Sequence, residues 1–501
     1  MNRSEGGVVA EAVVEERQLL KSLRWYDGFV IALANPGFLI GFLGYSIGTL
    51  GGWGAVALWS ASMVIGVLSN WIYSESAAMF PDKPGGISLY AHEGWRRYFS
   101  LVGPVASFGY WFAWSSVLSI FGLVVGSLIQ AQWFSGSDWT FSTGLADNLG
   151  LGHVIGGALI VAVWAFNIFG IRPALWVSYV AGAMLMIPLA VFIVLPYLTG
   201  DWQSSNLTWA LNDEGQPWGG WKLALVWLYL MGWSAYGVEA CATFAPEYKN
   251  TVRDTTLALR SSALFSLGVY ALLPLGITGA VGQQAAIDDP VAFYVPAFAQ
   301  IVGGASDLMV VLLIASLVLS MNVATADGSR ALFGIARDRM TVRELDHLNR
   351  YHVPGRAMTV DMVVNLLLLF FVGNTLAILV AGNLGYIVAH FFALTGFILL
   401  RRDRPAWPRP IRLAPAWVWI AGVLAALNAV FIAVGATNPS LTGYGGTREA
   451  FYGLGVLAIS IVLFVFRRVV QDREPLRLRE DPPSVPAATQ QTSEGVAAAG
   501  T

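Results

Sequence analysis

One glutamate, Glu239, lies within an otherwise apolar stretch that runs from Leu223 to Phe244. Burying a carboxylate in hydrocarbon costs roughly 3 kcal/mol on insertion scales, so intramembrane acids usually face a cavity, a partner group or a transported ligand. Trp233, Tyr236 and Gly237 precede it on the same stretch. We therefore expect Glu239 to line a pathway, with Trp233 and Tyr236 beside it; packing or lipid contact is the alternative role for Trp233.

A second group of helix-disrupting residues lies in the first apolar stretch. Asn35, Pro36 and Gly37 follow one another there, and Gly41 comes one turn later. Proline has no amide hydrogen and clashes with the preceding turn, so we expect the helix to unwind at this point. Two interrupted helices, five spans apart, are typical of transporters whose substrate site lies near the bilayer midplane. The alternative is that both sites are only kinks, which are common in membrane helices.

Three acids lie close to the inner ends of apolar stretches. Asp27, Glu75 and Asp327 occupy these positions, and Arg330 follows Asp327 by one turn. We expect such acids to pair with arginines and hold an inward gate shut, although exposed ion pairs are individually weak.

Further titratable residues lie in or near the spans. His390 lies well inside a late stretch and could titrate near neutral pH; a neutral, hydrogen-bonded histidine is the favoured alternative. Glu247 and Asp254 follow the stretch that contains Glu239, and we expect them to be solvated loop charges.

The composition requires a membrane. Of 501 residues, 56% are hydrophobic and 12% are charged, against about a quarter charged in soluble proteins. About twelve apolar stretches are long enough to cross a bilayer as helices. They lie at approximately 28–50, 54–79, 101–133, 152–171, 174–198, 222–245, 257–282, 304–325, 358–373, 376–400, 413–435 and 450–468. The sequence does not show the short segments of alternating polar and apolar residues that are typical of a membrane β-barrel.

Basic residues accumulate in every second connection, which places both termini in the cytoplasm of a multi-pass protein of the plasma (inner) membrane. The net charge of −2 conceals this asymmetry, and the lone Cys241 excludes an internal disulfide. We divide the chain into a cytoplasmic segment (1–24), spans 1–5 (25–200), spans 6–10 (218–400), two last spans (413–468) and a disordered cytoplasmic tail (469–501).

Several motifs resemble those of the amino acid–polyamine–organocation (APC) superfamily of transporters. Residues 237–243 (GVEACAT) and 246–250 (PEYKN) are similar to the sixth-helix signature of its glutamate/GABA and arginine/agmatine antiporters. Residues 329–338 (SRALFGIARD) and 409–415 (RPIRLAP) match in order and spacing. The resemblance implies an all-α, LeuT-like fold of two inverted five-helix repeats plus two outer helices, with discontinuous helices 1 and 6.

The same resemblance implies alternating access, with an amino acid or related small amine bound between the two broken helices. Trp233 and Tyr236 would cover the substrate, and Glu239 would respond to protonation or hold a cation-binding network. Relatives usually carry a Gly-Ser-Gly turn in helix 1 that grips a carboxylate, and residues 35–44 (NPGFLIGFLG) lack a clear counterpart. A polyamine or amino alcohol is therefore an alternative substrate, although Gly37 or Gly41 could still expose amides.

The expected energy source is the proton gradient or exchange for a counter-substrate. The fifth stretch lacks the lysine that replaces sodium in some relatives. A sodium site would need the polar residues of the eighth stretch, and membrane-helix hydroxyls more often bond to their own backbone. The polar residues in question are Ser316, Ser320, Asn322 and Thr325.

Other classes of protein fit less well. An ion channel should show polar rings or a selectivity filter, and an enzyme should show clustered catalytic or metal-binding residues. The five histidines and one cysteine are scattered, and a phosphate-binding glycine loop is missing. We expect no cofactor, no metal and no nucleic-acid partner.

Overall fold

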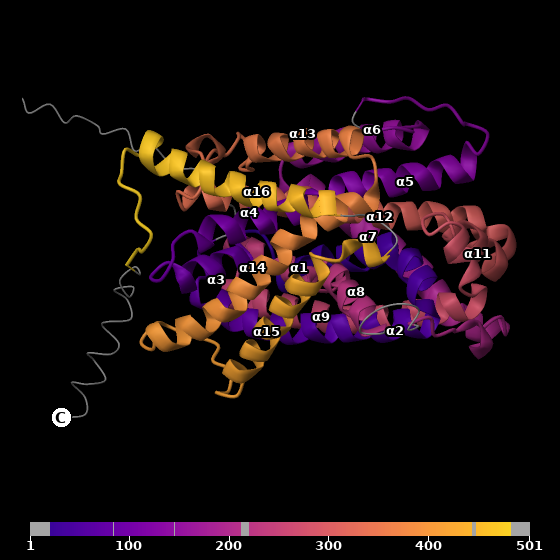
Figure 1. Cartoon of the computed structure of the whole chain (residues 1–501), viewed down its shortest axis with the longest axis horizontal. Coiled ribbons are helices and arrows are strands. Elements are labelled where there is room, and N and C mark those ends of the chain that lie inside the picture. The colour runs from indigo at the N-terminus through magenta and orange to yellow at the C-terminus, as the bar shows by residue number, and fades with distance from the viewer. Residues whose placement is uncertain (1–20, 84, 145, 212–219, 443–446, 482–501) are drawn as a thin grey trace, which may run out of the picture.

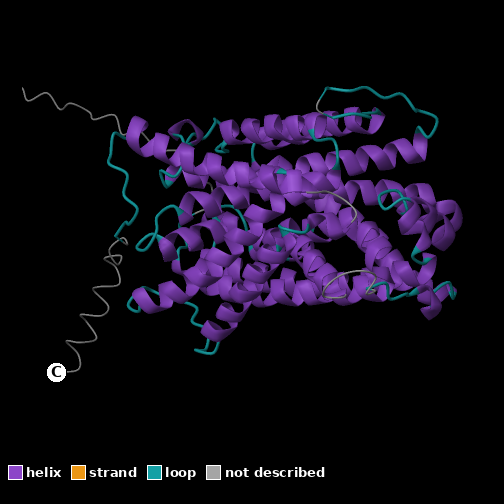
Figure 2. Ribbon diagram, viewed as in Figure 1, coloured by secondary structure: helices purple, strands orange, loops and turns teal. Residues whose placement is uncertain are grey.

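The described part of the chain is all-helical. The computed structural model describes residues 21–83, 85–144, 146–211, 220–442 and 447–481, and this part contains helices and loops but no named strand (Figure 2). Most of the predicted 1–24 segment and residues 482–501 of the predicted tail lie outside it. Helices satisfy every backbone hydrogen bond within one segment, as a bilayer requires.

The main helices follow the predicted apolar stretches along the sequence. Their bounds are α1 Trp25–Ala32, α2 Ala34–Met79, α3 Gly86–Trp95, α4 Val102–Ser115, α5 Val117–Trp133, α6 Leu151–Ile168, α7 Ile171–Thr199, α8 Gly220–Ala235, the 3₁₀ helix η2 Gly237–Glu247, α9 Thr251–Val281, α10 Gln284–Asp288, α11 Tyr294–Val302, α12 Ser306–Arg337, the 3₁₀ turn η4 Arg343–Leu345, α13 Gly355–Phe371, α14 Thr375–Asp403, α15 Trp417–Gly435 and α16 Thr447–Phe466.

Nine helical stretches of the described chain are long and apolar enough to cross a membrane. The first covers Trp25–Met79, 55 residues, which as one straight helix would be about 80 Å long against about 30 Å of hydrocarbon. Gly51 breaks it with a φ of 73°, a left-handed conformation that glycine adopts readily. The predicted spans at 222–245 and 358–373 correspond to α8 with η2 and to α13; α8 and α13 have only 16 and 17 residues.

Most helices run along the long axis of the molecule (Figure 1). The helix α3 and residues 472–481 lie toward one end, and α11 lies at the other. The helix α2 packs along α9, and α14 packs against α3 and α4. A Cβ added to Gly109 of α4 would lie 2.4 Å from the carbonyl oxygen of Gly385 in α14, so the close approach of these helices requires glycine.

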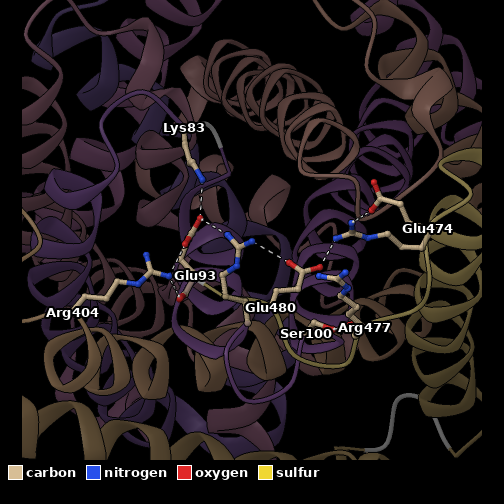
Figure 3. Close-up of polar contacts among 9 residues, drawn as sticks. Lys83, Glu93, Ser100, Arg404, Glu474, Arg477 and Glu480 are labelled. Carbon is tan, nitrogen blue, oxygen red and sulfur yellow. Dashed lines mark hydrogen bonds and ion pairs between the residues drawn. The ribbon is translucent and has the colours of Figure 1, made fainter. Parts of the chain in front are cut away.

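Residues 472–481, which we call the C-terminal segment, follow the short π-helix Arg467–Gln471 at the end of α16 and lie against the connection between α3 and α4 (Figure 3). The backbone N–H of Glu480 donates to the carbonyl of Arg96 at 2.8 Å, and its carboxylate pairs with Arg96 at 3.0 Å and with Arg468. The predicted disordered tail, 469–501, thus begins with a docked segment. Its polar composition hides this, because the partners of its acids are arginines far away in the sequence.

Candidate functional site

The first helix break lies at Leu33, between α1 and α2. Pro36 has no N–H to donate to the carbonyl of Ala32, where α1 ends. We expected residues 34–37 to unwind; instead Asn35, Pro36 and Gly37 lie in the first turn of α2. Proline is tolerated in the first turn of a helix because the N–H groups there have no partner within that helix. The interruption is therefore shorter than predicted.

The second break lies at Tyr236, where α8 ends and the tighter helix η2 begins. The two breaks face each other, since a Cβ added to Gly237 would lie 2.5 Å from the side-chain oxygen of Asn35. In Figure 1 the helices α1 and α8 both appear near the middle of the view. Gly237 thus permits close contact between the two interrupted spans.

Glu239 lies in the first turn of η2 and is 1% exposed. Its Oε1 accepts hydrogen bonds from the hydroxyl of Tyr386 in α14 at 2.5 Å and from Nε1 of Trp114 in α4 at 3.3 Å. Its Oε2 is buried and has no hydrogen-bond partner in the described chain. Both donors are neutral, so this carboxyl could bind a proton or a cationic group through the second oxygen.

Two further polar groups at the breaks are buried without hydrogen-bond partners in the part of the chain that the structure describes. They are the side-chain amide of Asn35, both of whose polar atoms are unsatisfied, and the hydroxyl of Tyr236. Buried polar groups in proteins are nearly always hydrogen-bonded, so such exceptions call for an explanation. A bound solute with its own donors and acceptors would satisfy them.

Trp233 belongs to an aromatic cluster inside the bundle. Its ring lies 5.1 Å from that of Phe38 and 5.4 Å from that of Phe42, and its Nε1 donates to the carbonyl of Ala113. Trp233 is 3% exposed, so it contacts protein rather than lipid. Phe38 of this cluster also lies against the second break, since a Cβ added to Gly237 would lie 3.2 Å from its ring.

The predicted glycines of the first span make close helix contacts. A Cβ on Gly37 would lie 2.1 Å from Oγ of Ser320 in α12, and one on Gly41 would lie 2.4 Å from the ring of Phe121. Gly37 remains at the N-terminal end of α2, where helix dipoles favour negative groups. Gly41 lies deeper inside the same helix.

His390 of α14 is fully buried beside the site. Its Nδ1 and the hydroxyl of Tyr73 form a hydrogen bond of 2.8 Å. The centre of its ring lies 4.9 Å from that of Tyr236 and 4.6 Å from that of Tyr386. Tyr386 therefore connects His390 to Glu239. The Nε2 atom has no partner within the described residues.

Glu247 forms an ion pair that the sequence did not suggest. We expected a solvated loop charge, and this prediction is wrong, because Glu247 is 2% exposed and both its oxygens bind the guanidinium of Arg330. The pair joins the end of η2 to α12, and the carbonyl of Glu247 also accepts from the N–H groups of Ser22 and Leu23. Asp254 is likewise 7% exposed rather than solvated.

The three predicted gate acids have different partners. Glu75 binds Arg401 at 2.5 Å and lies 3.5 Å from Arg409, so it ties α2 to α14 and the following loop. Asp27 accepts instead from the hydroxyl of Tyr179 and the backbone of Arg24. Asp327 is fully buried and accepts from Tyr110 and Thr243.

Trp114, Tyr386 and Tyr110 were not among the predicted site residues. Each is an aromatic hydrogen-bond donor in an apolar helix, and the chain has 20 tryptophans and 17 tyrosines. Only their distance to a buried acid distinguishes them, and that distance depends on helix packing. For Tyr386 the sequence does offer one local indication, because it lies four residues before His390, on the same face of the helix.

The described residues contain no group of three or more histidines, cysteines or acids arranged to hold a metal. The hydroxyls of Ser316 and Thr325 donate to carbonyls of their own helix, at Leu313 and Met321. The side-chain oxygen of Asn322 accepts from Asn167. These contacts reduce the oxygen atoms that α12 could offer to sodium.

An all-helical bundle with several membrane-spanning helices, two of them interrupted around a buried acid, defines a multi-pass membrane transporter. Residues 24–461 match the sequence profile of the amino acid permease family, so the chain belongs to this family of the APC superfamily. An uncharacterized amino acid permease, YvbW, of Bacillus subtilis is 24% identical over 336 residues, 65% of this chain and 72% of the relative. An uncharacterized transporter of Mycobacterium tuberculosis is 24% identical over 337 residues, 64% and 67% of the two chains.

Proposed function

We propose that this permease is a secondary transporter that moves an amino acid or a related small amine across the plasma membrane by alternating access. One observation carries the proposal: the unsatisfied polar atoms of Asn35, Tyr236 and Glu239 are buried at the two facing helix breaks. Polar groups inside a membrane protein are normally hydrogen-bonded to one another. A cluster of buried polar groups without such partners fits a site that binds and releases a solute.

The proposed architecture has twelve spans, with spans 1–5 and 6–10 forming inverted repeats of the LeuT-like kind and both termini cytoplasmic. The turn at Gly51 supports this count, because it divides the first helical stretch into two crossings. The breaks at Leu33 and Tyr236 fall in the first helix of each half.

In this proposal the ammonium of the substrate faces Oε2 of Glu239 and the hydroxyl of Tyr236, and Trp233 packs over it. A carboxylate would meet the amide of Asn35 and the N-terminal end of α2, including Gly37. A polyamine or amino alcohol without a carboxylate is the second candidate, because no basic side chain is within hydrogen-bonding distance of the Asn35 amide among the described residues.

Coupling to protons or exchange suits this site better than sodium. Glu239 and His390 connect through Tyr386 and offer groups that bind protons. In α12, by contrast, Ser316 and Thr325 donate to their own backbone.

In this proposal two ion pairs close the site at its predicted cytoplasmic end. Arg330 with Glu247 joins η2 to α12, and Arg401 with Glu75 joins α14 to α2. Their breakage would open the site inward, and Asp27 and Asp327 would support the same closure through hydrogen bonds.

The test is uptake of radiolabelled amino acids and amines by proteoliposomes, with imposed pH, sodium or counter-substrate gradients. Glu239→Gln should lower flux at least about tenfold, a barrier increase of about 1.4 kcal/mol, or remove its pH dependence, since the amide cannot bind a proton or pair with an ammonium. Comparing each amino acid with its decarboxylated amine decides between the two substrate classes.

Asp307→Asn serves as the matched control. Asp307 lies exposed at the start of α12, bonded to Gln132, and its loss should leave flux unchanged. Wild-type flux and pH profile retained in Glu239→Gln would contradict the role of Glu239, and no flux of any tested solute would contradict the function.

A further inference from the structure

A second buried acid, Asp361 of α13, resembles Glu239 in its surroundings. It is fully buried, and its Oδ1 accepts from Nε1 of Trp111 at 2.5 Å. Its Oδ2 is buried with no hydrogen-bond partner among the residues described. The ion pairs of the described chain do not include it.

Among the described residues, the helix α12 beside Asp361 contributes one other buried acid, Asp327, and one buried base, Arg330, which is bound by Glu247. On α12, a Cβ added to Gly328 would lie 2.7 Å from Oδ2, so the helix backbone covers this oxygen, and Asp327 is the preceding residue of that helix. The exposed Arg356 of α13 donates away from it, to the carbonyl of Glu344.

The other packed elements are α4, α5, α6 and η4. Next to Asp361, α4 and α5 supply Trp111 and a network around Asn365, whose amide donates to Ser115 and to the backbone of Asp361 and whose oxygen accepts from Ser119. The titratable residue of α6, His153, lies at the far end of that helix and contacts Gly373, and Arg343 and Glu344 of η4 are exposed.

Three aromatic side chains of α4 each donate to one buried acid. Tyr110 donates to Asp327 of α12 at 2.9 Å, Trp111 to Asp361 at 2.5 Å, and Trp114 to Glu239 of η2 at 3.3 Å. One helix thus contacts carboxyls from three elements. A displacement of α4 relative to α12 and α13 would change the hydrogen bonds of all three.

An unpaired carboxylate inside a membrane protein is costly, and a carboxyl that keeps its proton avoids that cost. The side-chain donors to Asp361 in the described chain, among them Trp111, are neutral, so a bound proton removes the charge that an arginine would otherwise compensate. Acids in such positions are typical of proton relays.

We propose that Asp361 is a second proton-binding residue of the transport cycle, separate from the substrate site at Glu239. It binds the proton while Gly328 covers Oδ2 and releases it when α12 and α13 move apart and water enters. This inference rests on the proposed proton coupling. It assigns Asp361 to coupling rather than to substrate binding.

The test uses the full-length permease in proteoliposomes, with substrate flux and proton movement recorded together from pH 5 to pH 8. Asp361→Asn keeps the acceptor for Trp111, so binding of substrate and exchange should persist, while the number of protons moved per substrate falls and the pH profile flattens. Glu239→Gln should differ by impairing substrate affinity as well.

Trp111→Phe gives an independent measurement if Asp361→Asn does not fold. It keeps the acid and removes the indole donor, which should shift the midpoint of the pH profile upward by about 0.5–1 pH unit, the equivalent of one net hydrogen bond. Asp307→Asn is the control for the loss of an acid far from the site.

An unchanged proton stoichiometry and pH profile in Asp361→Asn, or an unchanged midpoint in a folded Trp111→Phe, would overturn the proposal for Asp361 alone. A wild-type protein that transports without moving protons and without pH dependence would refute proton coupling and this inference together. A wild-type protein with no flux would refute the transport function itself.

Discussion

Single acidic residues in this permease are distinguished by whether a cation faces them. Glu239 and Asp361 have only neutral donors, whereas Glu93 of α3 faces Lys83 at 2.7 Å, Arg96 at 3.4 Å and Arg404 at 2.8 Å (Figure 3). Burial alone would raise the pKa of Glu93, but Lys83, together with His92 and Arg96, outweighs burial and holds this pKa at about 2. Glu239 and Asp361, which face no cation, fit a role in binding protons or substrate. Glu93, which faces three cations, fits a role in stabilising the fold.

The low pKa of Glu93 predicts a pH-dependent stability. A carboxyl whose pKa falls on folding stabilises the folded state above its unfolded pKa of about 4.5, and this contribution is lost as the pH falls toward 2. Glu93→Gln should lower the melting temperature of the detergent-solubilised protein at pH 6, since it leaves the buried Arg404 without its carboxylate partner at a cost of roughly 3 kcal/mol.

The measurement is the melting temperature at pH 6, 4.5 and 3. The wild type should lose more stability across this range than Glu93→Gln. Asp82→Asn is the control, because Asp82 lies in an exposed pair with Lys21 at 3.8 Å. Equal pH slopes for Glu93→Gln and the wild type would show that Glu93 is not the titrating group.

At the scale of the elements, the helix breaks are small but placed opposite one another. Leu33 and Tyr236 each interrupt a span by one residue, and Gly237 lies against Asn35 between them. A break of this size can bend with little loss of hydrogen bonding, which suits a gate that must open and close.

Pro36→Ala tests the first break. Alanine restores an N–H that can bond the carbonyl of Ala32, which should join α1 and α2 and favour the closed form by up to about 3 kcal/mol. We expect a higher melting temperature together with a several-fold lower rate of uptake.

Pro104→Ala is the matched control, because Pro104 lies in the first turn of α4 where no helical hydrogen bond is missing. It should change neither quantity much. Faster uptake in Pro36→Ala would argue against the break as a hinge.

At the scale of the whole molecule, ion pairs between residues far apart in the sequence attach the C-terminal segment to one end of the helix bundle. The C-terminal segment places Glu480 between Arg96 and Arg468, while Ser100 donates its backbone N–H and hydroxyl to the carbonyls of Leu478 and Arg477 (Figure 3). A polar cavity of about 730 Å³ lies beside this contact, between α3, the end of α12 and the segment.

Glu480→Gln should therefore weaken the attachment of the C-terminal segment. We expect about 1 kcal/mol lower stability, a smaller dependence of melting temperature on salt, and faster proteolysis of the segment. Glu474→Gln is the comparison, since the side chain of Glu474 is 46% exposed and its pairs should contribute less. Equal effects of the two substitutions would contradict this ranking.

The sequence alone determined the class of protein and the places where the spans are disturbed. The sequence shows directly the hydrophobic stretches of bilayer length and the positions of Pro36, Gly237 and Glu239 within them. Such stretches form helices in a bilayer, because a helix satisfies its own backbone hydrogen bonds. The membership of the permease family also follows from the sequence, through the match over residues 24–461.

Only the tertiary structure decided which acids are paired. Glu247 meets Arg330 from 83 residues away, and Asp361 meets Trp111 from 250 residues away. Neither spacing has a sequence signature, because the packing of helices that are distant along the chain sets these distances. Whether a buried carboxyl fits coupling or structure depends on the group opposite it, and that group is chosen by the fold.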